Sequence, residues 1–149
     1  EKDKRTLEES AMGAFLHDIG KTKVPIEILN KPGPLTQEEW KIMKRHPEYG
    51  LELIGNKPFP GRSKDIIVQH HEKINGIGYP FGLQGNQIHL ISQVVSIVDA
   101  YDAMTTNRCY QRAKTPFEAF RIITHDMKGH FTTRLVETFI QLLNLDKKR

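Results

Sequence analysis

The spacing of its apolar side chains restricts the fold of this 149-residue chain more than any other feature. Ile91, Val94, Val95 and Val98 recur at intervals of three and four residues, which places them on one face of an α-helix although all four are β-branched. No stretch of useful length alternates apolar and polar residues as a half-buried strand does. We therefore expect an all-α domain, a helical bundle with functional loops between its helices.

Three capping sequences indicate where helices begin. A threonine stands three residues before a glutamate at Thr6, Thr36 and Thr115, and a proline follows the last of them at the first helical position. From Thr6 we expect a first helix over about residues 7–19, with Gly20 as its stop. Further helices are expected over about residues 37–46, 47–54, 63–71, 91–102, 117–127 and 135–143.

Two stretches contain too many prolines and glycines for regular structure. The first, residues 25–34, holds three prolines and is expected to be a loop. The second, residues 75–85, holds four glycines and a proline. Because it follows a histidine pair, we interpret this second stretch as a shaped functional loop.

The donors available to a metal ion are imidazoles and carboxylates, because the chain has one cysteine, Cys109, and no cysteine-based zinc site is possible. A single histidine near a helix end is usually structural. Here several candidates occur together at or near expected helix ends, and six ligands exceed the four that one tetrahedral ion needs, which favours a two-metal site for phosphoryl displacement. The candidates are His17, Asp18, His46, His70, His71 and Asp99.

Two cations and a bridging carboxylate complete this predicted site. Asp18 is the candidate for the carboxylate that joins two ions. Lys21, one turn further on, and Arg108, after the expected helix of Asp99, would neutralise phosphate oxygens. The other histidines, His89, His125 and His130, lack such neighbours and are interpreted as surface residues.

Five sequence motifs, taken in their order along the chain, indicate a known family. The motifs are LHDIGK at residues 16–21, His46-Pro47, His70-His71-Glu72, Gly78-Tyr79-Pro80 and VDAYDA at residues 98–103. They occur in the order typical of the HD-GYP branch of the HD-domain phosphohydrolases, which the chain resembles over nearly its whole length. The resemblance implies one HD-GYP domain over residues 1–149, with an HD-domain-like helical bundle and a Gly/Pro-rich functional loop. It also implies hydrolysis of cyclic di-GMP to linear pGpG or onward to GMP.

The resemblance assigns roles to individual residues. It implies a cofactor of two or three divalent metal ions, iron or manganese, held by the six ligands named above, with Asp18 and Lys21 as catalytic residues. The loop around residues 76–80 would line the substrate groove and meet partner domains of the GGDEF type. The implied contacts to cyclic di-GMP are Lys21, Gly78, Tyr79, Pro80 and Arg108.

The chain departs from the family pattern in places that concern the substrate. Asn75 stands where the family has aspartate, Cys109 where proline is usual, and Gln111 where a basic residue is common. A further ligand helix is usual upstream of the HD motif, so we expect the chain to be an N-terminally incomplete fragment of a longer protein. These departures leave open a degenerate domain that binds metal or cyclic dinucleotide and signals through protein contacts with little hydrolysis.

Charge and hydropathy limit the remaining classes of function. A net charge of +4 suits an anionic ligand, but Lys and Arg are scattered, so nucleic acid is not an expected partner and a nuclease is the last alternative. A phosphohydrolase of mononucleotides or alarmones is another alternative function, which the GYP loop disfavours. No segment approaches the roughly 20 apolar residues of a membrane span, so we expect no membrane insertion and a cytoplasmic protein. The oligomeric state stays open.

Overall fold

The computed structural model describes residues 2–107 and 112–146, and within them it contains helices and no strand. The expectation of an all-α domain is confirmed. In chain order the elements are α1 (Lys2–Leu16), the 3-10 turn η1 (Ile19–Lys23), α2 (Ile26–Leu29), α3 (Gln37–Met43), α4 (His46–Ile54), α5 (Ser63–Gln69), the 3-10 turn η2 (Gly85–Gln87), α6 (Leu90–Thr105), α7 (Pro116–Arg121), the π-helical turn η3 (Ile122–Asp126) and α8 (Thr133–Asp146).

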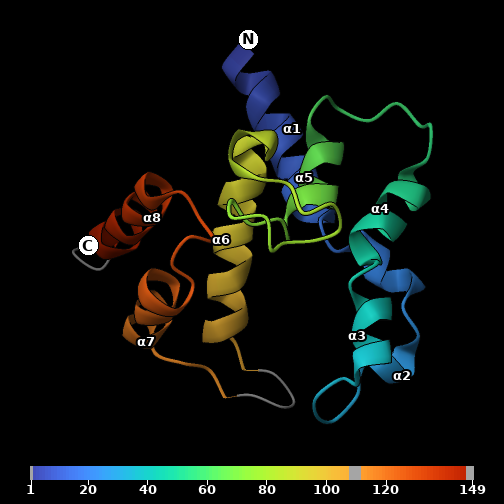
Figure 1. Cartoon of the computed structure of the whole chain (residues 1–149). Helices are drawn as coiled ribbons and strands as arrows, with labels where there is room; N and C mark the ends of the chain where they lie inside the picture. Colours follow the sequence, from blue (N-terminus) through green and yellow to red (C-terminus); the bar gives the residue numbers. More distant parts are fainter. Residues whose placement is uncertain (1, 108–111, 147–149) are drawn as a thin grey trace.

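Helix α6 runs through the middle of the molecule (Figure 1). On one side of it lie α1 and α5, which pack together, and beyond them α4, which contacts both α5 and η1. On the other side lie α7 and α8. An apolar core joins α6 to this second side, and its buried members are Ile97, Ile123, Phe131 and Val136.

Two of the three predicted caps are confirmed. The hydroxyls of Thr36 and Thr115 accept hydrogen bonds from the backbone N–H of the glutamate three residues on, and both capping boxes are complete. The cap at Thr6 is wrong, because α1 already begins at Lys2 and Thr6 lies inside it. A polar first turn extends this helix, and the i,i+4 ion pair of Arg5 with Glu9, at 3.0 Å, supports it.

The predicted ends of two helices also need correction. Helix α3 stops at Met43, and His46 begins α4 rather than ending α3, with Pro47 in the first turn where its missing N–H costs nothing. Helix α6 continues to Thr105, so Asp99 lies within the helix and not at its end. The continuation is stabilised by Tyr101 and Met104, which pack against the apolar core.

The two predicted loops contain more structure than expected. The proline-rich stretch includes the one-turn helix α2, whose Ile28 is buried. The second loop is closed at its base by an isolated antiparallel bridge between Asn75 and Gln84, and its exit is the 3-10 turn η2. The loop therefore has a fixed shape, as the sequence predicted from its composition.

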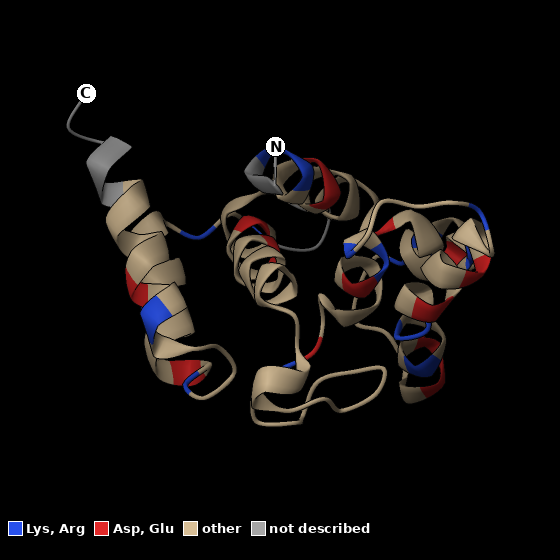
Figure 2. Cartoon of the chain, turned by 90° about the horizontal axis from the view of Figure 1, so that it is seen from above, with Lys and Arg blue, Asp and Glu red and all other residues tan. Residues whose placement is uncertain are grey.

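Along the described helices, positions of Lys and Arg are interspersed with positions of Asp and Glu (Figure 2). Among the described residues, none of the helices is long and apolar enough to cross a membrane.

Candidate metal centre

The site begins at the turn between α1 and η1, where His17 and Asp18 lie. The next residue but one, Gly20, is fully packed against α4, and a Cβ there would collide with the carbonyl oxygen of His46 and the backbone nitrogen of Gly50. Only glycine permits this close approach of two backbones. The approach brings Asp18 beside His46, although 27 residues separate them in the sequence.

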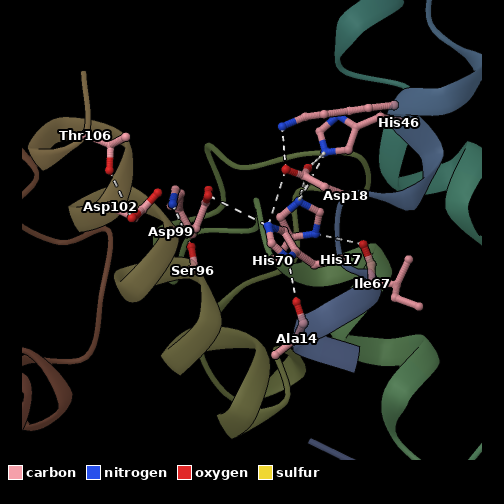
Figure 3. Close-up of polar contacts among 12 residues, drawn as sticks. Ala14, His17, Asp18, His46, Ile67, His70, Ser96, Asp99, Asp102 and Thr106 are labelled. Carbon is pink, nitrogen blue, oxygen red and sulfur yellow. Dashed lines mark hydrogen bonds and ion pairs between the residues drawn. The ribbon is translucent and has the colours of Figure 1, made fainter. Parts of the chain in front are cut away.

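Four of the six candidate ligands form one compact cluster (Figure 3). Each of Asp18, His46, His70 and His71 offers a ligand atom, and these four atoms lie within 4.8 Å of one another. They come from three different elements, because His70 and His71 follow directly on α5. His46 and His70 are almost fully buried, with 1% and 0% of their surface exposed.

Backbone carbonyls orient three of the histidine rings. In each ring Nδ1 is hydrogen-bonded to a carbonyl oxygen three residues earlier, and because a carbonyl only accepts, Nδ1 carries the hydrogen. A neutral ring then presents the lone pair of Nε2 to the cluster, as in metal-binding histidines held by a second hydrogen bond. The distances are 2.7 Å for His17 to Ala14, 2.9 Å for His46 to Met43 and 2.8 Å for His70 to Ile67.

This orientation places two lone pairs against each other. Nε2 of His46 and Nε2 of His70 are 3.1 Å apart. Burial lowers the pKa of both rings, that of His70 to about 3, so both are neutral near pH 7. Two facing acceptors repel, and a cation between them removes the repulsion.

The carboxylate of Asp18 supplies the matching negative charge. Its Oδ1 lies 3.3 Å from Nε2 of His46 and 3.8 Å from Nε2 of His70, and this buried atom has no hydrogen-bond partner in the described part of the chain. An orphaned buried carboxylate oxygen beside two bare imidazole nitrogens is a donor set that suits a divalent ion. The residues present therefore fit a metal.

The second oxygen of Asp18 faces another group of residues. Oδ2 lies 2.6 Å from Nζ of Lys21 and 3.4 Å from Nε2 of His17, which is itself 3.8 Å from Oδ1 of Asp99. Hydrogen bonds to Asp18 and Asp99 raise the pKa of His17 to about 10. Burial alone would raise the pKa of Asp18, but hydrogen bonds from His17 and Lys21 lower it well below its usual range. Asp18 thus presents one oxygen to each half of the site.

All six predicted ligands are near one another, and their role as ligands stays a prediction. The two outside the compact cluster, His17 and Asp99, adjoin it through Asp18. The predicted phosphate contact Arg108 lies outside the described residues, as do Cys109 and Gln111.

The Gly78-Tyr79-Pro80 segment folds back over the histidines. The ring of Tyr79 stacks on that of His71, with centroids 4.7 Å apart and an interplanar angle of 26°. A Cβ at Gly78 would collide with the backbone of Glu72 and Lys73, so glycine permits the loop to lie this close. The side-chain oxygen of Asn75, a departure from the family pattern, accepts a hydrogen bond from the backbone of Ile77.

Sequence reasoning missed the residue that holds this loop. Glu72 is 2% exposed, and its two carboxylate oxygens accept hydrogen bonds from the backbone N–H groups of Phe81, at 2.7 Å, and Leu83, at 2.9 Å. A buried carboxylate needs such donors. The position of Glu72 directly after the histidine pair was the sequence signal that could have identified it.

Lysine 73 is a second residue that the sequence did not single out. Its Nζ donates to the hydroxyl of Ser96 at 2.8 Å and lies 4.5 Å from the ring centre of Phe131. Burial lowers the pKa of Lys73 to about 8. Lys73 thereby ties the start of the loop to α6.

The three remaining histidines were all expected to be surface residues, and the structure confirms this for one of them. His125 is exposed, but His89 and His130 are half-buried, and Nδ1 of each is buried without a hydrogen-bond partner in the described part of the chain. They do not belong to the cluster of four, and the interpretation as surface residues holds only for His125.

A cleft of about 700 Å³ adjoins the site between α1 and α6. Its walls are mostly apolar, with Leu7 and Ala11 on one helix and Val94 and Val98 on the other. His17, Asp99 and Asp102 also line it. Among the described residues, the cleft is thus lined by carboxylates and by no lysine or arginine.

The fold and the cluster define an all-α domain with a candidate His/Asp metal centre. Residues 1–147 match the model of the HD domain family, and the chain belongs to that family. The resemblance to HD-GYP domains drawn from the motifs is confirmed by the relatives.

Two curated relatives and one solved structure illustrate the similarity. A cyclic di-GMP phosphodiesterase of Pseudomonas aeruginosa is 37% identical over 140 residues, which are 93% of this chain and 34% of the relative. A 3'3'-cGAMP-specific phosphodiesterase of Vibrio cholerae is 37% identical over 85% of this chain and 24% of the relative. The structure of Bd1817, an HDG"Y"P protein from Bdellovibrio bacteriovorus, is 26% identical, with a TM-score of 0.74 over 91% of this chain and 43% of that one.

The chain spans about a third of the length of the Pseudomonas relative. Family membership and the His/Asp cluster together indicate that the domain binds divalent metal. The number and identity of the ions are not set by these observations, because imidazole and carboxylate suit several metals.

Proposed function

We propose that the domain is a metal-dependent phosphodiesterase that hydrolyses cyclic di-GMP to linear pGpG, to GMP, or to both. The observation that carries the proposal is the convergence of Asp18 Oδ1 with the facing Nε2 atoms of His46 and His70. Similarity to a cyclic di-GMP phosphodiesterase over 93% of the chain supports the substrate.

The two sides of Asp18 suggest how the ligands would divide. His46, His70 and His71 would hold one divalent ion with Oδ1, and His17 and Asp99 a second with Oδ2. Bound there, iron or manganese would supply the hydroxide nucleophile by lowering the pKa of water to roughly 7, and would offset charge on the phosphate. The carbonyls that bind Nδ1 of three histidines keep the rings in place for this role.

Other residues of the chain would bind and orient the substrate. Lys21 is paired with Asp18, and its ammonium becomes available to a phosphate oxygen once that carboxylate binds metal. Tyr79, with Gly78 and Pro80, forms a wall against His71. Arg108 is assigned a second phosphate contact by the motif alone. Exposed Ile77, at 66%, and Phe81, at 59%, support a protein contact at this loop, and the motif alone assigns that contact to a GGDEF-type domain.

The test combines metal analysis with product analysis. The protein is loaded with Fe(II) or Mn(II) under reducing conditions, its metal content is measured, and cyclic di-GMP, pGpG and GMP are separated by chromatography. We expect turnover that depends on metal. Bound metal without turnover would instead support the degenerate domain, which binds metal or cyclic dinucleotide and signals through protein contacts.

A second cyclic dinucleotide is a candidate substrate. The Vibrio cholerae relative that is specific for 3'3'-cGAMP is as identical to this chain as the Pseudomonas enzyme is. Both compounds contain two phosphodiester groups and differ in one base, so the metal cluster does not discriminate between them. Measuring kcat/KM for each compound in the same assay decides which is preferred.

A further inference from the structure

One lysine next to the cluster has no acidic partner among the described residues. The Nζ of Lys44 lies 5.4 Å from the ring centre of Tyr79 and 5.8 Å from that of Trp40. Two other lysines are paired with acids, Lys21 with Asp18 at 2.6 Å and Lys23 with Glu52 at 2.7 Å, and half-buried Lys73 donates to the hydroxyl of Ser96 on α6 at 2.8 Å. Lys44 is therefore a cation that two aromatic rings hold and no carboxylate neutralises.

The position of Lys44 relative to the cluster follows from the ring contacts. Tyr79 stacks on His71, and its ring is also 6.5 Å from that of His46. Lys44 is thus one aromatic ring away from two candidate ligands. Helix α3 ends just before it, and α4 begins at His46 just after it, so the backbone at both ends is fixed.

Charge around the cluster is unequal on its two sides. The side of α6 presents the carboxylates of Asp99 and Asp102 to the apolar cleft. The opposite side, where η1 and α3 meet α4, presents Lys21 and Lys44. An anionic substrate held at the cluster is attracted to the second side, because the exposed carboxylate of Asp102 repels it from the first, where half-buried Lys73 is already bonded to Ser96.

A cyclic dinucleotide has two phosphodiester groups, and one step of hydrolysis breaks one of them. The other keeps its negative charge, and until the ring opens it is held close to the reacting group. We propose that Lys44 binds this second phosphate group, with Trp40 and Tyr79 holding its ammonium in place. This inference rests on the proposed function and makes Lys44 a specificity-determining residue for substrates with two phosphates.

The test compares a substrate with two phosphates and one with a single phosphodiester. Lys44→Met keeps the aliphatic contact with the rings and removes the charge, and Lys44→Arg keeps the charge. Lys41→Met is the matched control, because it removes the same charge three residues earlier, at an exposed position in the last turn of α3. The substrates are cyclic di-GMP and bis(p-nitrophenyl) phosphate, both with the Mn(II)-loaded protein.

We expect Lys44→Met to raise KM for cyclic di-GMP about tenfold, the loss of one charge-assisted hydrogen bond, with kcat within about twofold. Its kinetics with bis(p-nitrophenyl) phosphate should be unchanged, Lys44→Arg should recover most of the loss, and Lys41→Met should resemble the wild type. An equal loss with both substrates means that Lys44 acts through Tyr79 or the cluster and overturns the inference, as does no loss with either.

Calorimetric titration with cyclic di-GMP separates this inference from the proposed function. If the wild type binds the compound without cleaving it, hydrolysis is refuted, and about tenfold weaker binding to Lys44→Met than to Lys41→Met still supports the role of Lys44. Equal affinities of the two variants refute that role. A wild type that neither binds nor cleaves cyclic di-GMP refutes both.

Discussion

The two sides of α6 are stabilised in different ways. Towards α7 and α8 the contacts are apolar: the ring of Tyr101 stacks on Phe120 at 5.3 Å and meets Phe139 edge-on at the same distance. Towards α4 and α5 the centre consists of buried and half-buried histidines and half-buried carboxylates, in which Nε2 of His46 faces Nε2 of His70. The apolar side is stabilised by its own side-chain packing, whereas the polar side needs a cation to offset the repulsion between its facing ligand atoms.

The comparison is tested most strongly by Asp18→Asn, which removes the charge that balances both halves of the site. We expect hydrolysis to fall by at least about a thousandfold, since the metal contributes several kcal/mol to such reactions. Metal content and turnover are measured together. Asp102→Asn is the control, an acid-to-amide change on α6 that should leave metal content intact. Full metal content and near-normal turnover in Asp18→Asn would contradict the proposed centre.

On the apolar side, Ile123→Ala should lower the free energy of unfolding by about 3 kcal/mol, because Ile123 is 2% exposed and its truncation leaves a cavity. Urea denaturation measures this change. The folded variant should still bind as much metal as the wild type. A loss of metal from the folded variant would show that the two sides are not independent.

A smaller effect is expected in the number of protons that the polar side releases when it binds metal. In the metal-free protein the pKa of His17 is raised to about 10 by Asp18 and Asp99, so the ring is protonated from pH 7 to 9. A metal needs the neutral ring, so binding should release about one proton, and the affinity for metal should increase as the pH rises through this range. Calorimetry in buffers of different ionisation enthalpy counts the proton. His17→Gln should abolish the release, and an unchanged count would exclude His17 as a ligand.

The smallest effect is expected at the cap of α7. Thr115→Ala removes the hydroxyl that accepts from the backbone of Glu118 and should cost about 1 kcal/mol of unfolding free energy. Thermal or urea denaturation measures it, with metal content and turnover unchanged. Thr36→Ala makes the matched change at the cap of α3, the helix that ends just before Lys44 and His46. If both variants kept normal turnover, the polar side would tolerate fraying of α3.

Prediction from the sequence was most successful where the signal was local. The caps at Thr36 and Thr115 and the register of α6 depend on residues three or four apart, and all were correct. The cap at Thr6 failed because a polar turn before it is itself a good helix former. Asp99 was placed near a helix end because the packing of Tyr101 that extends α6 involves distant residues.

The sequence by itself determined the fold class, the six candidate ligands and the membership of a family, because these depend on residue type, spacing and order. Only the tertiary structure decided that Asp18 presents one oxygen to His46 and the other to His17, that Glu72 holds the loop, and that Lys44 lies over Tyr79. These facts depend on the directions of side chains from separate helices. The close contact at Gly20 fixes part of that arrangement, and its effect on distant residues appears only when the chain is folded.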